Sequence, residues 1–293
     1  MFDVPVLMQF LFSGITMGSV YALIALGLVM VYNASKVLCF AQGEFFVFGA
    51  LSIIAFREMG IPTPVAFVLA IVVGALIGGI VERAFIRPMR NASVGMIITM
   101  TVGISLSMKG IAMLVWGRES HTLPPFTQGD PLAILGGYMS LQVLWVIGIT
   151  LVVLVLIWFF FEKTMIGLSV RACAERVAGA QLVGISVKRA TFFAWCWGSG
   201  LGALAGIVVS PLIFTQYASG TMPMLKGFTA IAIGGLGTVG AVVAGFALGL
   251  VEAYTIGLLS SKFADAIVFT ILILVLLGRS SGLIGRSKLG SGL

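Results

Sequence analysis

The sequence predicts an all-α polytopic membrane protein with about eight transmembrane helices and one further short or broken helix. Of its 293 residues, 60% are hydrophobic and 9% are charged, whereas a soluble domain carries about 25% charged residues. Apolar runs that are long enough to cross a bilayer, which takes about 20 residues, follow one another along the chain. Short loops between these runs hold most of the basic residues. We therefore expect residues 1–293 to form a single transmembrane domain.

Eight full spans are expected from the apolar runs. Their predicted limits are 6–32, 37–56, 62–81, 93–116, 141–161, 191–213, 239–259 and 264–278. The second span is the weakest because Glu44 interrupts it. The third is followed by a basic loop, VERAFIRPMR, and the fourth by a polar loop over residues 117–130.

The stretch KGFTAIAIGGLGTVG is too short for an ordinary span. We expect a short or half-length helix near residues 225–237 that is broken at Gly234, Gly235 and Gly237. Irregular backbone at membrane depth is tolerated only beside protein or a water-filled cavity, and such breaks mark translocation paths. The alternative is a tight glycine turn between two ordinary helices. Candidate residues of a translocation path are Gln42, Glu44, Gly234, Gly235, Gly237 and Thr238.

The distribution of basic residues predicts the orientation, because cytoplasmic loops carry an excess of Lys and Arg. With the N-terminus outside and the C-terminus in the cytoplasm, twelve of the seventeen basic residues lie on the cytoplasmic side. These are Lys36, Arg83, Arg87, Arg90, Lys163, Arg171, Arg176, Lys188, Arg189, Arg279, Arg286 and Lys288. Basic residues placed in this way are topology signals and do not indicate a nucleic-acid partner.

The loop over residues 162–189 is the only long polar interval, and it carries five basic residues between two uncharged runs. We expect a cytoplasmic helix at 169–182, with Ser169 as N-cap and Gly184 ending it in a left-handed turn. Six of the thirteen residues from Ala172 to Gly184 are Ala or Gly, so another protein can approach its backbone closely. The alternative is a helix that lies on lipid headgroups through its basic side chains.

Four charged residues fall within apolar runs, where ionisable groups are costly and need a partner. Glu44 is expected to face a polar cavity or a neighbouring helix. Lys109 is expected to extend to the outer surface. Glu252 and Asp265 are expected to pair with one of three lysines, Lys109, Lys226 or Lys262. The remaining span residues are mostly apolar, which predicts a path without a tight substrate site.

Several enzyme classes are excluded by the residues that the chain lacks. Its three cysteines are far apart, it has one histidine, and it contains no GxxxxGK[ST] loop. The chain therefore has no cofactor of its own, and ATP-driven work would need a partner. Glycines at four-residue spacing, as in Gly74 and Gly78 or Gly245 and Gly249, indicate close helix packing within the membrane.

Five stretches resemble the permease of branched-chain amino-acid ABC importers, and specifically the first of its two related permease subunits. They are FAQGEFFVFGA (40–50), VERAFIRPMR (81–90), GLSVRACAERVAGAQLVGIS (167–186), LKGFTAIAIGGLGTVGAVVAGFALGLVEA (225–253) and LILVLLGRSSGLIGR (272–286). The resemblance implies a bacterial inner-membrane complex. Its expected partners are a second related permease subunit, two ATPase subunits that hold ATP and Mg, and a periplasmic substrate-binding protein.

The resemblance also implies that the polar loop is the segment that couples to the ATPases. The residues assigned to this role are Gly167, Arg171, Ala172, Ala174, Glu175, Arg176, Ala178, Gly184 and Ile185. The chain departs from the family at Gln42, where His is frequent, and at Lys109, where a neutral amide is common. Other substrates of such permeases, namely urea or small carboxylates, remain alternatives. A carrier that works alone is the rival class, and uptake that survives ATP depletion would identify it.

Overall fold

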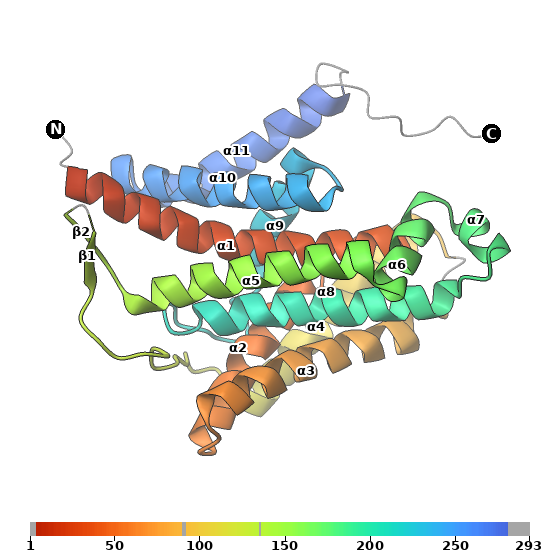
Figure 1. The fold of residues 1–293 in the computed structure, drawn as a ribbon, viewed down its shortest axis with the longest axis horizontal. Helices are drawn as coiled ribbons and strands as arrows, with labels where there is room; N and C mark the ends of the chain where they lie inside the picture. The colour runs from red at the N-terminus through yellow and green to blue at the C-terminus, as the bar shows by residue number, and fades with distance from the viewer. Residues whose placement is uncertain (1–3, 90–91, 135, 281–293) are drawn as a thin grey trace.

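The computed structural model describes residues 4–89, 92–134 and 136–280. It is a bundle of helices whose long axes run roughly side by side (Figure 1). The long helices are α1 (Val4–Ser35), α3 (Thr63–Val81), α4 (Val94–Trp116), α5 (Leu141–Lys163), α8 (Val187–Val209), α10 (Thr238–Leu258) and α11 (Ser261–Ser280). Two shorter helices lie within the bundle, α2 (Gln42–Glu58) and α9 (Thr221–Gly234).

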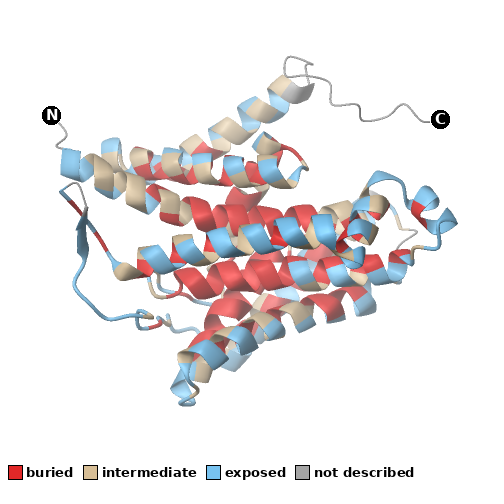
Figure 2. Ribbon diagram, in the orientation of Figure 1, coloured by how far each residue is buried: buried red, intermediate tan, exposed pale blue. Residues whose placement is uncertain are grey.

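The core of the bundle is formed by α1, α2 and α8 (Figure 2). Of the most apolar stretch of each helix, 89% is buried in α1 and 78% in α8, but only 17% in α5 and 11% in α11. All four helices are equally able to span a membrane by composition. The exposed apolar faces of α5 and α11 are therefore suited to lipid, whereas α1 and α8 are surrounded by protein.

Glycines bring the core helices into backbone contact, as their spacing predicts. A Cβ atom at Gly249 of α10 would overlap the backbone of Gly18 in α1. A Cβ at Gly74 of α3 would overlap the side chain of Ala203 in α8. Hydrophobic attraction between helices is absent in lipid, so the fit of such small residues supplies much of the packing energy.

The predicted spans agree with the observed helices, with shifts of a few residues at most ends. Among the described residues, seven helices have the length and composition to cross a membrane, and α2 and α9 are shorter, with 17 and 14 residues. The loop predicted after the third span is helical as far as Ile86, because a π-helical turn (η1, Glu82–Ile86) extends α3.

The glycine break occurs at the predicted residues but not at the predicted depth. α9 ends at Gly234, and Gly235 has φ +82°, a backbone conformation that glycine adopts without strain. Asn33, two residues before the end of α1, donates a hydrogen bond to the carbonyl of Leu236. The break therefore lies near the end of the bundle, and the alternative of a tight glycine turn describes it better than a break at membrane depth.

The mainly helical fold agrees with the predicted all-α class, and β1 (Leu132–Ile134) and β2 (Gly137–Met139) add one short antiparallel hairpin before α5. One prediction of local structure is wrong. The helix predicted at 169–182 is two helices, α6 (Met165–Glu175) and α7 (Val177–Leu182). Arg176 separates them with an extended backbone (φ −149°, ψ 110°).

The caps of this segment also differ from the prediction. Thr164 is the N-cap of α6, and its hydroxyl accepts a hydrogen bond from the amide of Gly167. Ser169 lies inside α6 and donates its hydroxyl to the carbonyl of Met165. Gly184 follows α7 with φ +81°, as predicted. The N-terminal end of α1 and the α6–α7 segment lie at opposite ends of the bundle (Figure 1). Arg90, Arg286 and Lys288 lie outside the described residues.

Candidate functional site

The two short helices α2 and α9 begin beside each other in the interior of the bundle. The amide of Gln42, the first residue of α2, donates to the carbonyl of Gly198 at 2.8 Å. Eleven residues of α8 lie on either side of Gly198, so α2 begins at about half the depth of α8. Gly43 packs against the backbone of Gly220, the residue that precedes α9. Both helices are therefore interrupted within the membrane-spanning layer.

A segment without regular structure leads into α2. Residues 36–41 connect α1 to α2, and Val37, Cys39 and Ala41 are 5% or less exposed. Irregular backbone is tolerated at membrane depth only where protein or water surrounds it. This segment and the start of α9 are therefore the place where two spanning helices are replaced by helices that begin inside the bundle, as in the interrupted helices of transporters.

Four polar side chains meet at this junction, and they come from α2, α4 and α9. Ser105 donates its hydroxyl to Oε1 of Glu44 at 3.0 Å. The same oxygen lies 3.6 Å from Nζ of Lys109, and Lys109 donates to the hydroxyl of Thr221 at 2.8 Å. The side chain of Glu44 is 2% exposed and that of Lys109 is 25% exposed. We name these four residues the α2–α4–α9 polar cluster.

The polar cluster is incomplete as a hydrogen-bond network. Oε2 of Glu44 and Oε1 of the neighbouring Gln42 are buried and have no partner among the described residues. A buried polar atom without a partner costs about 1–3 kcal/mol. Together with a lysine that is partly exposed at membrane depth, this arrangement is suited to a face that meets water, a substrate or another protein rather than lipid.

The structure brings together only some of the predicted path residues. Gln42 and Glu44 lie at the junction, whereas Gly234, Gly235, Gly237 and Thr238 lie at the turn between α9 and α10. The predicted extension of Lys109 to the outer surface is wrong, because Lys109 turns towards Glu44 and Thr221. Ser105 and Thr221 were not predicted, since a single hydroxyl in a span is too common to indicate a site.

A second buried charge cluster fixes the helices around α9. Lys226 lies 2.7 Å from Oε1 of Glu252 and 2.8 Å from Oδ1 of Asp265, and Tyr21 donates its hydroxyl to Oε2 of Glu252 at 2.7 Å. The predicted pairing of Glu252 and Asp265 with a lysine is confirmed, and Lys226 is that lysine. Lys226 is buried within the bundle, with 7% of its surface exposed. Each charge has a partner, which indicates a structural role.

The polar loop contains one helix that packs on the bundle and one that projects from it. In α6, Gly167 packs against the backbone of Phe160 and Phe161, and Cys173 is buried. Lys36, just after α1, donates to the carbonyl of Ala174. These contacts hold α6 against the ends of α1 and α5, and they leave Gly167 inaccessible to another protein.

The second helix, α7, is exposed along most of its length. Ala178 and Gly179 are exposed, Leu182 is 89% exposed, and the following Val183 is 75% exposed. Only Ala180 is buried within α7. Figure 1 shows α7 standing away from the long helices. Exposed apolar side chains on a projecting helix are typical of a protein-docking surface. The predicted coupling residues did not include Leu182 and Val183, although both lie within the Ala- and Gly-rich stretch from Ala172 to Gly184.

The remaining predicted coupling residues divide between the two helices. Arg171 is exposed on α6 and forms an ion pair with Glu162 at 2.6 Å. Ala172 and Ala174 are half-buried, Glu175 and Arg176 are exposed, and Gly184 and Ile185 follow α7. An exposed ion pair contributes little to stability, about 0–1 kcal/mol. Exposed residues lie on both helices, and they are most continuous over residues 175–184, where only Ala180 is buried.

Comparisons with known proteins relate this helical bundle to membrane permeases. The family model described as "Branched-chain amino acid transport system / permease component" matches residues 10–276. The permease protein LivH of the high-affinity branched-chain amino acid transport system of Escherichia coli (strain K12) is 32% identical, over 96% of both chains. The corresponding BraD protein of Pseudomonas aeruginosa is 29% identical over the same shares.

The fold also resembles that of a solved structure. A chain of PsaBC from Streptococcus pneumoniae, determined in complex with Fab, superposes with a TM-score of 0.50 at 13% sequence identity, over 96% of this chain and 93% of that chain. This likeness supports the fold alone. The family match covers most of the sequence, and it includes both the α2–α4–α9 polar cluster and the α6–α7 segment. The chain belongs to the family of permease components of branched-chain amino-acid transport systems.

Proposed function

We propose that the chain is the permease subunit of an ATP-driven importer for branched-chain amino acids in the bacterial inner membrane. The family match over residues 10–276 carries this proposal. Its expected partners are a second related permease subunit, two ATPase subunits and a periplasmic binding protein, with ATP and Mg held by the ATPases. The excess of basic residues at the end of the bundle that bears α6 and α7 supports a cytoplasmic location for that end, with the N-terminus outside.

In this proposal, the α2–α4–α9 polar cluster lies on the translocation path. A free amino acid carries an ammonium and a carboxylate group, and the cluster offers a carboxylate, Glu44, beside an ammonium, Lys109, at 3.6 Å. The N-termini of two interrupted helices lie beside this pair, and half-helix N-termini attract anionic groups. In this proposal the mostly apolar path carries one charge pair, which lies near the half-depth of the bundle.

Coupling to the ATPases is assigned to the α6–α7 segment. α6 is held by α1 and α5, so a force applied to α7 is transmitted to the ends of the spanning helices. α7 and the residues around it supply the docking surface, chiefly Glu175, Arg176, Ala178, Leu182 and Val183.

The proposal is tested by uptake into vesicles that contain the chain together with its co-purified subunits. Radiolabelled leucine should accumulate only when ATP and the binding protein are both supplied. Uptake that follows a proton gradient and continues without ATP would instead identify a carrier that works alone. Uptake of urea or a small carboxylate in place of leucine, with ATP still required, would support an ATP-driven importer. It would contradict the assignment of branched-chain amino acids as its substrate.

A further inference from the structure

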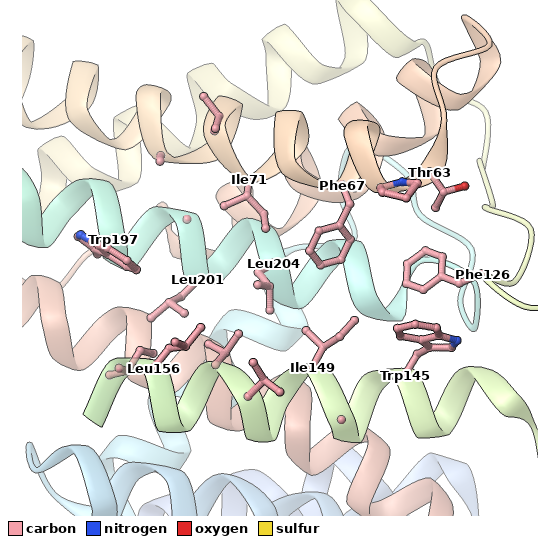
Figure 3. A pocket seen from close by; sticks show the side chains of 18 of the residues that line it. Thr63, Phe67, Ile71, Phe126, Trp145, Ile149, Leu156, Trp197, Leu201 and Leu204 are labelled. Carbon is pink, nitrogen blue, oxygen red and sulfur yellow. The ribbon is translucent and has the colours of Figure 1, made fainter. Parts of the chain in front are cut away.

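A long apolar groove lies on the face of the bundle formed by α3, α5 and α8. It has a volume of about 1350 Å³, larger than the ~300–1,000 Å³ of common small-ligand pockets. Figure 3 shows its side chains: Phe67 and Ile71 extend from α3, Ile149 and Leu156 from α5, and Leu201 and Leu204 from α8 between them. Val72, Val152 and Trp197 at its rim are 45%, 59% and 43% exposed, so the groove is open to the surroundings of the bundle.

A smaller cavity of about 370 Å³ lies at the α6 end of the same helices and is basic. Its lining residues are Arg83, Arg87, Lys188, Arg189, Phe192 and Phe193. Arg87 forms an ion pair with Glu82 at 2.9 Å. The side chains of Arg83, Lys188 and Arg189 are exposed and form no ion pair with any residue that the structure describes. Three cations therefore lie together without a counter-charge.

The basic cavity and the apolar groove lie along one helix seam. Phe192 lines the first and Cys196 lines the second, and these residues are one turn apart on α8. Gly79 of α3 packs against both: a Cβ there would lie 2.9 Å from Sγ of Cys196 and 3.0 Å from Phe192. The apolar groove and the basic cavity therefore lie one after the other along the same helices, as do the acyl chain and the charged headgroup of an anionic phospholipid.

We propose that this seam binds an anionic phospholipid, with its phosphate at Arg83, Lys188 and Arg189 and an acyl chain along the groove. Basic pockets between spanning helices bind anionic headgroups, and each buried methylene adds about 0.8 kcal/mol of binding energy. This inference does not depend on the proposed function. The leaflet that supplies the lipid follows from the proposed orientation and is the cytoplasmic one.

A transmembrane helix of another subunit fits this seam less well. Helices that pack in lipid approach through continuous stripes of small residues, whereas the groove is walled by side chains such as Phe67, Trp145 and Leu204. The cytoplasmic flanks of spanning helices are themselves basic, so the basic cavity would repel them.

The test uses fluorescence quenching by phospholipids brominated in their acyl chains. The full-length chain, with the subunits that co-purify with it, is reconstituted in phosphatidylcholine with increasing brominated phosphatidylglycerol or brominated phosphatidylcholine. We expect a component of quenching that saturates at a low mole fraction of the anionic lipid only. Trp145→Phe/Trp197→Phe should remove most of it, because both tryptophans line the groove. Trp158→Phe should retain it, because Trp158 is 61% exposed and does not line the groove.

The charge variants separate specific binding from general attraction to an anionic surface. Arg83→Gln/Arg189→Gln should shift the saturating component to a higher mole fraction, by about fivefold for each charge removed, which corresponds to ~1 kcal/mol per basic residue. Lys163→Gln/Arg176→Gln removes two exposed charges outside the cavity and should leave it in place. Equal quenching by both lipids would overturn the proposal. So would a component that saturates at an unchanged mole fraction in Arg83→Gln/Arg189→Gln, or one of undiminished size in Trp145→Phe/Trp197→Phe. Absence of the component in the assembled complex would show that protein covers the seam and would also overturn it.

Discussion

Nζ of Lys226 in α9 lies 2.7 Å from Oε1 of Glu252 in α10, and this pair is buried in the bundle. Asp265 of α11 forms a second ion pair with Lys226, and Tyr21 of α1 donates its hydroxyl to Glu252. A short helix of 14 residues has few turns with which to anchor itself. The cluster therefore ties α9 to three long helices, so that the N-terminal end of α9 keeps its place beside α2.

We predict that Lys226→Met destabilises the protein strongly, because it leaves Glu252 buried without a cation. The expected loss in the free energy of unfolding is ~3–5 kcal/mol. Glu252→Gln should cost less, since Tyr21 and Lys226 can still bond to the amide and Lys226 keeps Asp265. Thermal unfolding of the purified variants in detergent measures both. Lys262→Met is the control, because Lys262 is exposed, and a change there within ~0.5 kcal/mol is expected. A loss in Lys226→Met no larger than this would contradict a structural role for the cluster.

The polar cluster at Glu44 predicts that stability and transport respond differently when its two charges are removed. Lys109→Met leaves the Glu44 carboxylate with only Ser105 as partner, which should cost about 1–3 kcal/mol of stability. Glu44→Gln/Lys109→Met removes both charges and should recover much of this loss while import stays low. Thermal unfolding and ATP-driven leucine uptake, measured on the same preparations, decide the point. Wild-type uptake by the double variant would show that the charge pair is not needed on the path.

The exposure of α7 predicts which substitutions weaken the binding of the ATPase subunits. Ala178→Trp places a large ring on the exposed face of α7, and we expect it to weaken ATPase binding by at least ~2 kcal/mol, or about 30-fold. Arg176→Ala should cost less than ~1 kcal/mol, since an exposed charge at a wet rim contributes little. Co-purification of the ATPases with each variant gives the comparison, with membrane insertion as the control. Full retention of the ATPases by Ala178→Trp would exclude α7 as the docking helix.

The contact between α1 and α10 predicts a packing defect. Gly249→Leu should destabilise the chain by at least ~1–3 kcal/mol, because the side chain has no room beside the backbone of Gly18. Gly103→Ala is the matched change in α4, where a Cβ would meet no atom within 4 Å. There we expect a gain of up to about 1 kcal/mol from helix propensity. Thermal unfolding of the isolated chain measures both, and equal effects would refute the packing argument.

The sequence alone determined the class of protein, most of the spans and the existence of a glycine break after α9. These features depend on the length of apolar runs, on where basic residues interrupt them and on the backbone freedom of glycine, all of which are local properties. The family resemblance rested on motifs that keep their order along the chain, and the family match over residues 10–276 confirmed it.

Only the tertiary structure decided which residues meet. Ser105 and Glu44 are 61 positions apart, and Lys109 and Thr221 are 112 apart, so no periodicity relates them. The depth at which α2 begins was equally hidden, because residues 37–41 are as apolar as a span and differ only in the protein that surrounds them. The break at Arg176 also escaped prediction, since Arg is a good helix former and its extended backbone is imposed by the packing of α6 on the bundle. Contacts between distant segments fix such features, and a local pattern carries no information about them.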